Sequence, residues 1–74
     1  MDIDMATRAE RLAKFETASD PPLDSVVEVL CEDHVGTYRL PWLCRSTPEG
    51  LRNEGTGELI EGRVVGWRYP LHRT

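Results

Sequence analysis

The stretch SVVEVLCEDHVGTYRLPWLCRS, residues 25–46, determines the fold of this chain. Residues 25–32 are rich in β-branched side chains, and residues 37–46 alternate apolar and polar side chains; both patterns predict β-strands. Val35 and Gly36 predict a two-residue turn between them, because glycine tolerates the positive φ that such turns need. The sequence therefore predicts an antiparallel hairpin.

This turn also predicts the register of the hairpin. Every facing pair is then apolar, as a buried face requires: Val27 with Cys44, Val29 with Trp42, and Cys31 with Leu40. The face so formed, which places Trp42 in the core, consists of Tyr38, Leu40, Trp42 and Cys44. The other face carries Arg39, Pro41 and Arg45, and the proline indicates an edge or a bulge.

Two more strands are expected after the hairpin. Thr47-Pro-Glu-Gly50 and Glu54-Gly-Thr-Gly57 are typical turns, and they enclose a short third strand at residues 51–53. Residues 58–69 predict a fourth strand, which a bulge at Gly62 would interrupt. Along it, Val65, Trp67 and Tyr69 alternate onto one face, and residues 70–74 are expected to form a loose tail.

The N-terminal part predicts one short helix over residues 4–17. Thr7 and Glu10 have the spacing of a capping box, and Asp4 is the alternative N-cap. The apolar stripe of this helix is thin, so it either docks on the rest of the domain or frays, and we expect it to dock. The helix ends at Ser19-Asp-Pro-Pro22, a stiff connector, because neither proline can continue it.

These elements predict a single domain over residues 1–74, with the helix at 4–17, a β-meander at 25–69 and the tail at 70–74. The fold class is α+β: one N-terminal helix followed by a small, curled antiparallel meander of about four strands. Turn signals at intervals of 8–12 residues favour an SH3-like or partly open barrel.

Charge is distributed unevenly. Residues 1–37 carry nine acids and three bases, and residues 38–74 carry four acids and six arginines, for a net charge of −4. A nucleic-acid-binding protein usually has a clustered basic patch and a high pI. The acidic balance therefore argues against nonspecific phosphate binding.

Neither a membrane span nor a secretory signal is expected. No apolar run approaches the length of about 20 residues that a membrane helix needs. The acidic start, Met1-Asp-Ile-Asp4, leads into no apolar stretch. We expect a cytoplasmic protein that keeps its two cysteines reduced.

Cysteine and histidine offer the only metal or nucleophile candidates. Cys31 and His34 are spaced as one zinc-ligand pair, with Cys44 and His72 as candidates for further ligands, but zinc sites typically combine two such pairs. Both cysteines alternate with core residues, which favours buried thiols over a nucleophile or a zinc site. We expect no catalytic residue, no metal ligand and no cofactor.

Aromatic and arginine side chains are the better binding candidates. Arg39, Arg68, Trp67 and Tyr69 would form a recognition face of the residue types that dominate binding hot spots, although the two aromatic residues could also fill the core. The leading hypothesis is a non-catalytic protein-interaction module that binds an unknown protein partner or itself, without nucleic acid or membrane. The alternatives are a small barrel that binds nucleic acid through this face, and a zinc protein that uses Cys31, His34 and Cys44.

Two stretches resemble a group of small, uncharacterised bacterial proteins. They are CEDHVGTYRLPWLC, residues 31–44, and TGELIEGRVVGWR, residues 56–68, whose counterparts in that group are a similar hairpin and a similar VVGWR ending. The resemblance covers roughly residues 26–68 and implies a compact β domain. It implies no activity, cofactor or binding residue.

Overall fold

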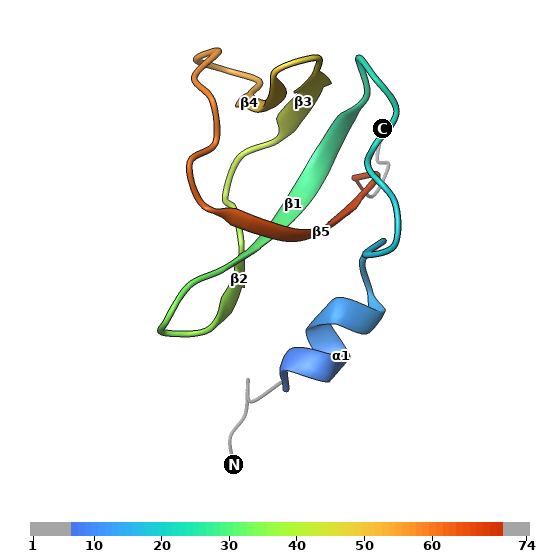
Figure 1. Cartoon of the computed structure of the whole chain (residues 1–74), viewed down its shortest axis with the longest axis vertical. Helices are drawn as coiled ribbons and strands as arrows, with labels where there is room; N and C mark the ends of the chain where they lie inside the picture. The colour runs from blue at the N-terminus through green and yellow to red at the C-terminus, as the bar shows by residue number, and fades with distance from the viewer. Residues whose placement is uncertain (1–6, 71–74) are drawn as a thin grey trace.

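The computed structural model describes residues 7–70, which form one short helix and an antiparallel sheet of five strands (Figure 1). The elements in chain order are α1 (Arg8–Ala13), β1 (Val26–Glu32), β2 (Thr37–Arg39), β3 (Cys44–Thr47), β4 (Gly50–Asn53) and β5 (Arg63–Arg68). The broad α+β prediction is confirmed. The expectation of about four strands is corrected to five within residues 7–70, and the sheet does not close into a barrel.

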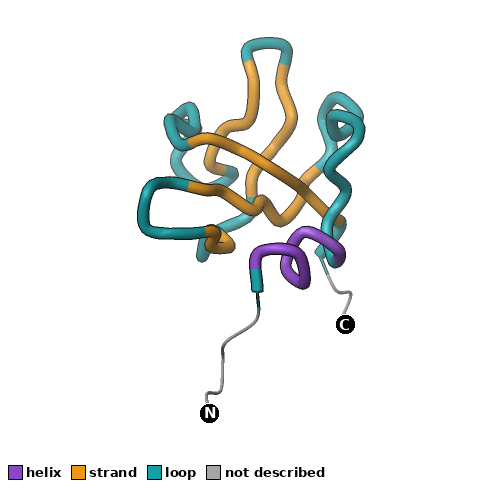
Figure 2. Tube along the Cα trace, turned by 60° about the horizontal axis from the view of Figure 1, so that its bottom comes forward, coloured by secondary structure: helices purple, strands orange, loops and turns teal. Residues whose placement is uncertain are grey.

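β1 is the centre of the sheet. Its first part pairs with β3, its second part pairs with β2, and β5 lies along the opposite edge. β3 continues into β4 through the tight turn that the sequence predicts at residues 47–50. The strands curl around a common interior, and α1 lies at one side of the sheet (Figure 2).

The predicted register of the first hairpin is correct at one end and wrong at the other. Val27 pairs with Cys44 as expected, whereas Cys31 pairs with Tyr38 instead of Leu40, a shift of two residues. The cause is the turn. The Asp33 carboxylate accepts hydrogen bonds from the backbone N–H groups of Val35, at 2.8 Å, and of the following glycine, at 3.2 Å. This Asx-type turn occupies residues 33–36, two residues more than expected.

The pairing of β1 with β2 is shifted by two residues relative to its pairing with β3, and the chain between β2 and β3 absorbs this shift. The expected strand over residues 37–46 is therefore divided, and Pro41 lies in the interruption, where its missing N–H breaks no ladder. Leu40 and Cys44 remain buried. Trp42 turns outward with 41% of its surface exposed, so its predicted place in the core is wrong.

The core lies inside the curl of the sheet. Its buried members are Val27, Val29, Cys31, Leu40, Cys44 and Trp67, with Leu51 and Ile60 packed against them. Three of these come from alternate positions of β1, which confirms the alternation that the sequence shows. Trp67 is 9% exposed, and its indole Nε1–H donates to the carbonyl of Ser19 at 2.7 Å.

The last strand is shorter than expected. Residues 58–69 were predicted as one strand, but β5 begins at Arg63, and only an isolated bridge between Leu59 and Arg52 precedes it. Gly62 lies in a bend, and the register irregularity occurs further on, where Leu30 pairs with Gly66 and Cys31 with Val64. The chain therefore contacts β4 first and then crosses to β1.

The helix is also shorter than predicted, because α1 covers only Arg8–Ala13 within the expected range 4–17. The capping box is confirmed: the Thr7 side chain accepts from the N–H of Glu10, and the Glu10 carboxylate accepts from the N–H of Thr7. The alternative N-cap, Asp4, lies outside the described residues, as do residues 71–74 of the expected tail.

The N-terminal segment docks mainly through the residues that follow the helix. No residue of α1 is buried; its contacts are an ion pair between Arg8 and Glu32 and a hydrogen bond from Arg11 to the Thr37 carbonyl. Beyond it, Glu16 exchanges two backbone hydrogen bonds with Trp67, of 2.6 and 3.0 Å. This segment therefore adds to the outer edge of β5.

On the face of β1 that points away from the core, the N-terminal segment packs beside one residue, Leu30. Leu30 points away from the core and is nevertheless fully buried. Its cross-strand partner is Gly66, beside which the Phe15 side chain lies so close that a Cβ on the glycine would meet it at 2.9 Å. The glycine therefore allows the N-terminal segment to pack against the sheet.

Candidate functional site

The four binding residues that the sequence suggests are distributed over both faces of the sheet. Arg39 pairs across from Leu30, and Arg68 pairs across from Glu28, so both arginines lie on the face opposite the core. Trp67 belongs to the core itself. Tyr69 is 56% exposed and contacts the Trp67 ring edge-on, with 5.3 Å between ring centroids.

Two of the arginines that could form a basic face, Arg45 and Arg68, already have carboxylate partners. Arg68 donates from Nε to Glu28 at 2.7 Å, and its guanidinium lies 4.3 Å from the centre of the Phe15 ring. Arg45 makes two bonds of 2.8 Å to Glu54. Arg39, by contrast, is exposed on β2. The side chains of these paired arginines are partly satisfied within the domain, which weakens their attraction for an external anion.

The cysteine and histidine candidates do not come together. Cys31 and Cys44 are fully buried free thiols in the core, and His34 is exposed in the turn after β1. Within residues 7–70, no group of three or more His, Cys, Asp or Glu side chains is arranged to hold a metal ion. The remaining candidate of the sequence, His72, lies outside the described residues.

Burial makes both thiols weak acids. It raises the pKa of Cys31, and it raises the pKa of Cys44 to about 11, with a smaller contribution from the Cys31 thiol and an opposing one from the Trp42 indole. A thiolate is the reactive form of cysteine. Neither residue is therefore suited to nucleophilic chemistry at neutral pH.

We expect both thiols to resist a thiol reagent at pH 8 in the native protein and to react fully in urea. Because the folded state retains the Cys44 proton to higher pH than the unfolded chain does, its contribution to stability is present below pH 9 and is lost as the pH rises toward 11. Urea unfolding between pH 8 and pH 11 measures this loss, which should be smaller in Cys44→Ala. Rapid labelling of the native protein would contradict the assignment.

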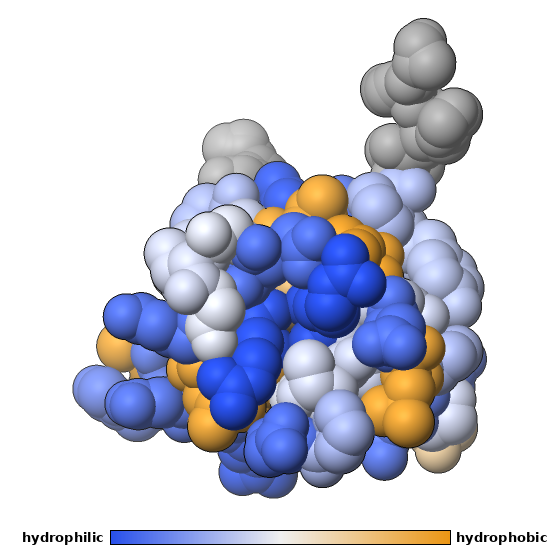
Figure 3. All heavy atoms as spheres, turned by 90° about the horizontal axis from the view of Figure 1, so that it is seen from above, coloured by the Kyte–Doolittle hydropathy of each residue, from blue (hydrophilic) through white to orange (hydrophobic). Residues whose placement is uncertain are grey.

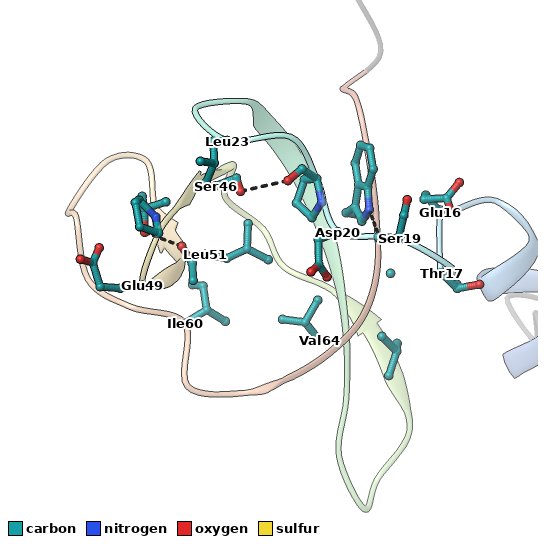
Figure 4. A pocket seen from close by; sticks show the side chains of 17 residues that line it. Glu16, Thr17, Ser19, Asp20, Leu23, Ser46, Glu49, Leu51, Ile60 and Val64 are labelled. Carbon is teal, nitrogen blue, oxygen red and sulfur yellow. Dashed lines mark hydrogen bonds between the residues drawn. The ribbon is translucent and has the colours of Figure 1, made fainter.

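Hollows open on the surface of residues 7–70. One of them, of about 690 Å³, lies between residues 16–23, the β3–β4 turn and β5 (Figure 4). Its floor is aliphatic, and Asp20 extends into the space above Ile60 and Val64. We call it the acidic cleft, because its other charged residues are Glu16 and Glu49. The Glu16 carboxylate already accepts from the Ala18 N–H at 3.0 Å.

The second hollow, of about 600 Å³, combines the interruption between β2 and β3 with the segment before β5. We call it the aromatic groove, and its principal residues are Tyr38, Leu40, Pro41, Trp42, Glu58, Leu59, Ile60, Glu61 and Gly62. Trp42 is accompanied by two other large exposed side chains, Tyr38 at 39% and Leu59 at 44%. Three large apolar side chains therefore line one hollow while keeping much of their surface in water.

The floor of this groove borders the core. The buried Cys31 side chain lines it. A Cβ at Gly62 would lie 3.6 Å from both the Tyr38 hydroxyl and the Cys31 sulfur, so these side chains approach the floor where the glycine leaves room. Partial burial raises the pKa of the Tyr38 hydroxyl. Aromatic rings with few free rotations lose little entropy when a ligand binds.

Sequence reasoning missed this groove because it assigned Trp42 to the core. Pro41 was the available signal: its position in an otherwise alternating strand indicated an irregularity, and an irregularity there changes which face the next residue occupies. Nothing in the sequence placed Leu59 near Trp42, since the two line the same hollow only through the curl of the sheet.

The face of the molecule seen from above is mainly hydrophilic, and its hydrophobic residues form small separate groups (Figure 3). Residues 7–70 contain no helix of the length and hydropathy that would cross a membrane. Comparison with known proteins gave no match to a family model, to a curated protein or to a solved structure.

Proposed function

We propose that this protein is a non-catalytic protein-interaction module with an SH3-like scaffold, which binds a partner protein through the aromatic groove. The observation that carries the proposal is that Tyr38, Trp42 and Leu59 line a single hollow while remaining about two-fifths exposed. Tryptophan and tyrosine side chains dominate the energetics of protein interfaces when they lie in a central pocket. A cytoplasmic location belongs to the same proposal.

The geometry gives less support to the alternatives. A nucleic-acid-binding face needs free cations beside aromatic rings. The aromatic groove instead contains two carboxylates, Glu58 and Glu61, which repel phosphate. A zinc protein would need Cys31, His34 and Cys44 to converge, whereas two are buried in the core and one is exposed in a turn.

Affinity capture with matched variants tests the proposed function. Wild-type protein, Trp42→Ala and Tyr69→Ala are immobilised at equal density and exposed to the same lysate. Both substitutions remove an exposed aromatic side chain, but only the first lies in the groove. We expect a set of proteins that wild type and Tyr69→Ala retain and that Trp42→Ala loses by about tenfold or more, since a hot-spot residue contributes about 2 kcal/mol.

Circular dichroism of the three baits verifies that each is folded. Equal retention by all three would refute binding through the groove. Native mass spectrometry of the same samples distinguishes self-association: a wild-type dimer that Trp42→Ala converts to a monomer would make a second copy of this chain the partner.

A further inference from the structure

We propose that the acidic cleft binds a small aliphatic amine, which is a saturated hydrocarbon chain that ends in a primary ammonium group. The cleft is separate from the aromatic groove, although Ile60 lines both hollows. The inference therefore goes beyond the proposed function, and either can fail without the other. Three properties of the cleft lead to it: its aliphatic floor, the sign of its charge, and the surroundings of the carboxylate that extends into it.

The floor of the cleft suits a hydrocarbon chain. Leu51, Ile60 and Val64 lie around the space that Asp20 enters (Figure 4), and Leu23 also lines the cleft. Leu23 and Val64 keep 63% and 38% of their surface in water. Sites for small molecules are mostly apolar hollows of about 300–1,000 Å³, and the volume of about 690 Å³ lies in this range. Methylene groups on a ligand would cover these side chains, and each fully buried methylene strengthens binding about fourfold.

The charge of the cleft selects a cation. The charged side chains among its described lining residues are all carboxylates: Glu16, Asp20 and Glu49. Asp20 extends into the space itself, and none of the ion pairs between residues 7–70 includes it (Figure 4). An ammonium group beside Asp20 would pair with this carboxylate, whereas an anionic ligand would be repelled.

The surroundings of Asp20 favour an ammonium group over a metal ion or a guanidinium. Calcium and magnesium ions take six or more oxygen ligands, but residues 7–70 contain no group of three or more His, Cys, Asp or Glu side chains that could hold a metal ion. A guanidinium gains from stacking on an exposed aromatic ring. Trp67 is the aromatic residue of the described lining, and it is only 9% exposed. A carboxylate among aliphatic side chains instead matches a compact ammonium group on a hydrocarbon chain.

The walls of the cleft favour a free amine over the lysine side chain of a partner protein. Three segments bound the cleft: residues 16–23, the β3–β4 turn and β5 (Figure 4). A free amine can lie along the floor with its whole chain in contact. A lysine side chain ends in the same ammonium group, but its backbone must stay outside these walls, so fewer of its methylene groups reach the floor.

Nuclear magnetic resonance of the ¹⁵N-labelled full chain tests the proposal. Ethylammonium, butylammonium and hexylammonium chlorides are titrated at constant ionic strength, and the backbone amides of Leu51 and Val64 report on the cleft. The Trp42 indole lies in the aromatic groove and is the internal control. We expect the cleft signals to shift and saturate while the Trp42 signal stays in place. Hexylammonium should bind about fourfold to sixteenfold more tightly than butylammonium, because two further methylene groups are covered.

Matched variants separate the ion pair from the hydrocarbon contact. Asp20→Asn should weaken hexylammonium binding about twofold to fivefold, as expected for an exposed ion pair, and should leave the binding of uncharged hexanol unchanged. Glu61→Gln removes a carboxylate that lines the aromatic groove and not the cleft, so it should leave the binding of both ligands unchanged. Circular dichroism verifies that both variants are folded.

Four outcomes would overturn the proposal. The first is no shift of the cleft amides at a hexylammonium concentration of about 10 mM. The second is equal affinity for ethylammonium and hexylammonium, which would reduce the effect to charge alone. The third is the same shifts with magnesium chloride at equal ionic strength. The fourth is that Nα-acetyl-lysine amide binds as tightly as butylammonium, which would assign the cleft to the lysine of a partner protein. The capture experiment judges the proposed function separately.

Discussion

Trp67→Ala is expected to destabilise the protein by about 3–5 kcal/mol, the range for removing a buried tryptophan side chain. Trp67 is the largest buried side chain of the core, and its loss also leaves the Ser19 carbonyl without its indole donor. A chain of this length has a total stability of roughly 4–11 kcal/mol, so the change removes a large fraction of it. Urea unfolding followed by far-ultraviolet circular dichroism measures the effect.

Two variants identify the cause. Tyr69→Ala removes the neighbouring exposed ring and should cost less than about 1.5 kcal/mol, the contribution of an aromatic pair. Trp67→Phe keeps a ring in the core but removes the indole N–H, so its loss of stability should lie between those of Trp67→Ala and Tyr69→Ala. If Trp67→Ala unfolds at the same urea concentration as Tyr69→Ala, the assignment of Trp67 to the core is incorrect.

Gly66→Ala should destabilise the protein by about 1–3 kcal/mol through overpacking. The added Cβ would lie 2.9 Å from the Phe15 Cβ and 3.3 Å from both the Glu16 carbonyl oxygen and the Thr17 methyl carbon. Two of these atoms cannot move without the backbone. The substitution should therefore push the N-terminal segment off β5, and hydrogen exchange should show faster loss of protection at the Glu16 amide.

Gly62→Ala is the matched control. Its added Cβ would meet the Cys31 sulfur and the Tyr38 hydroxyl at 3.6 Å, an ordinary van der Waals distance. We expect its unfolding midpoint to remain close to that of the wild type. If the two alanine variants were equally stable and equally protected at Glu16, the close approach at Gly66 would have no structural role.

The strands and turns were predictable because their signals are local. β-branched residues predicted β1, proline and glycine predicted the turn at residues 47–50, and the spacing of Thr7 and Glu10 predicted the capping box. Each depends on residues within a few positions of one another, where backbone preference alone decides the conformation.

The register of the first hairpin was less predictable because it depends on a competition between a two-residue turn and a longer turn. Val35 and Gly36 suit a two-residue turn, but the Asp33 carboxylate stabilises a longer one by accepting two backbone hydrogen bonds. The sheet then accommodates the shift in register at Pro41, where the pairing loses no hydrogen bond from the proline because proline has no backbone N–H. Strand alternation contains no information about where such an irregularity is absorbed.

The candidate site was the least predictable part. The four residues singled out from composition lie on both faces of the sheet, and the aromatic groove unites residues 38–42 with residues 58–62. This juxtaposition results from the crossing of the chain from β4 to β1. A single sequence shows the aromatic and acidic residue types but not the crossing that brings them together.

The pairing of β5 has a consequence for the synthesis of the chain. Among the strands of residues 7–70, β5 is the last to leave the ribosome, yet it supplies the neighbour of β1 along one edge, the partner of Glu16 and the indole that binds Ser19. These contacts join residues that are about 30 to 50 positions apart, so they cannot form before β5 has been synthesised. A nascent chain that ends before Arg63 lacks the neighbour of β1 along one edge and the backbone partner of Glu16, so the structure of residues 7–70 is complete only after β5 has left the ribosome.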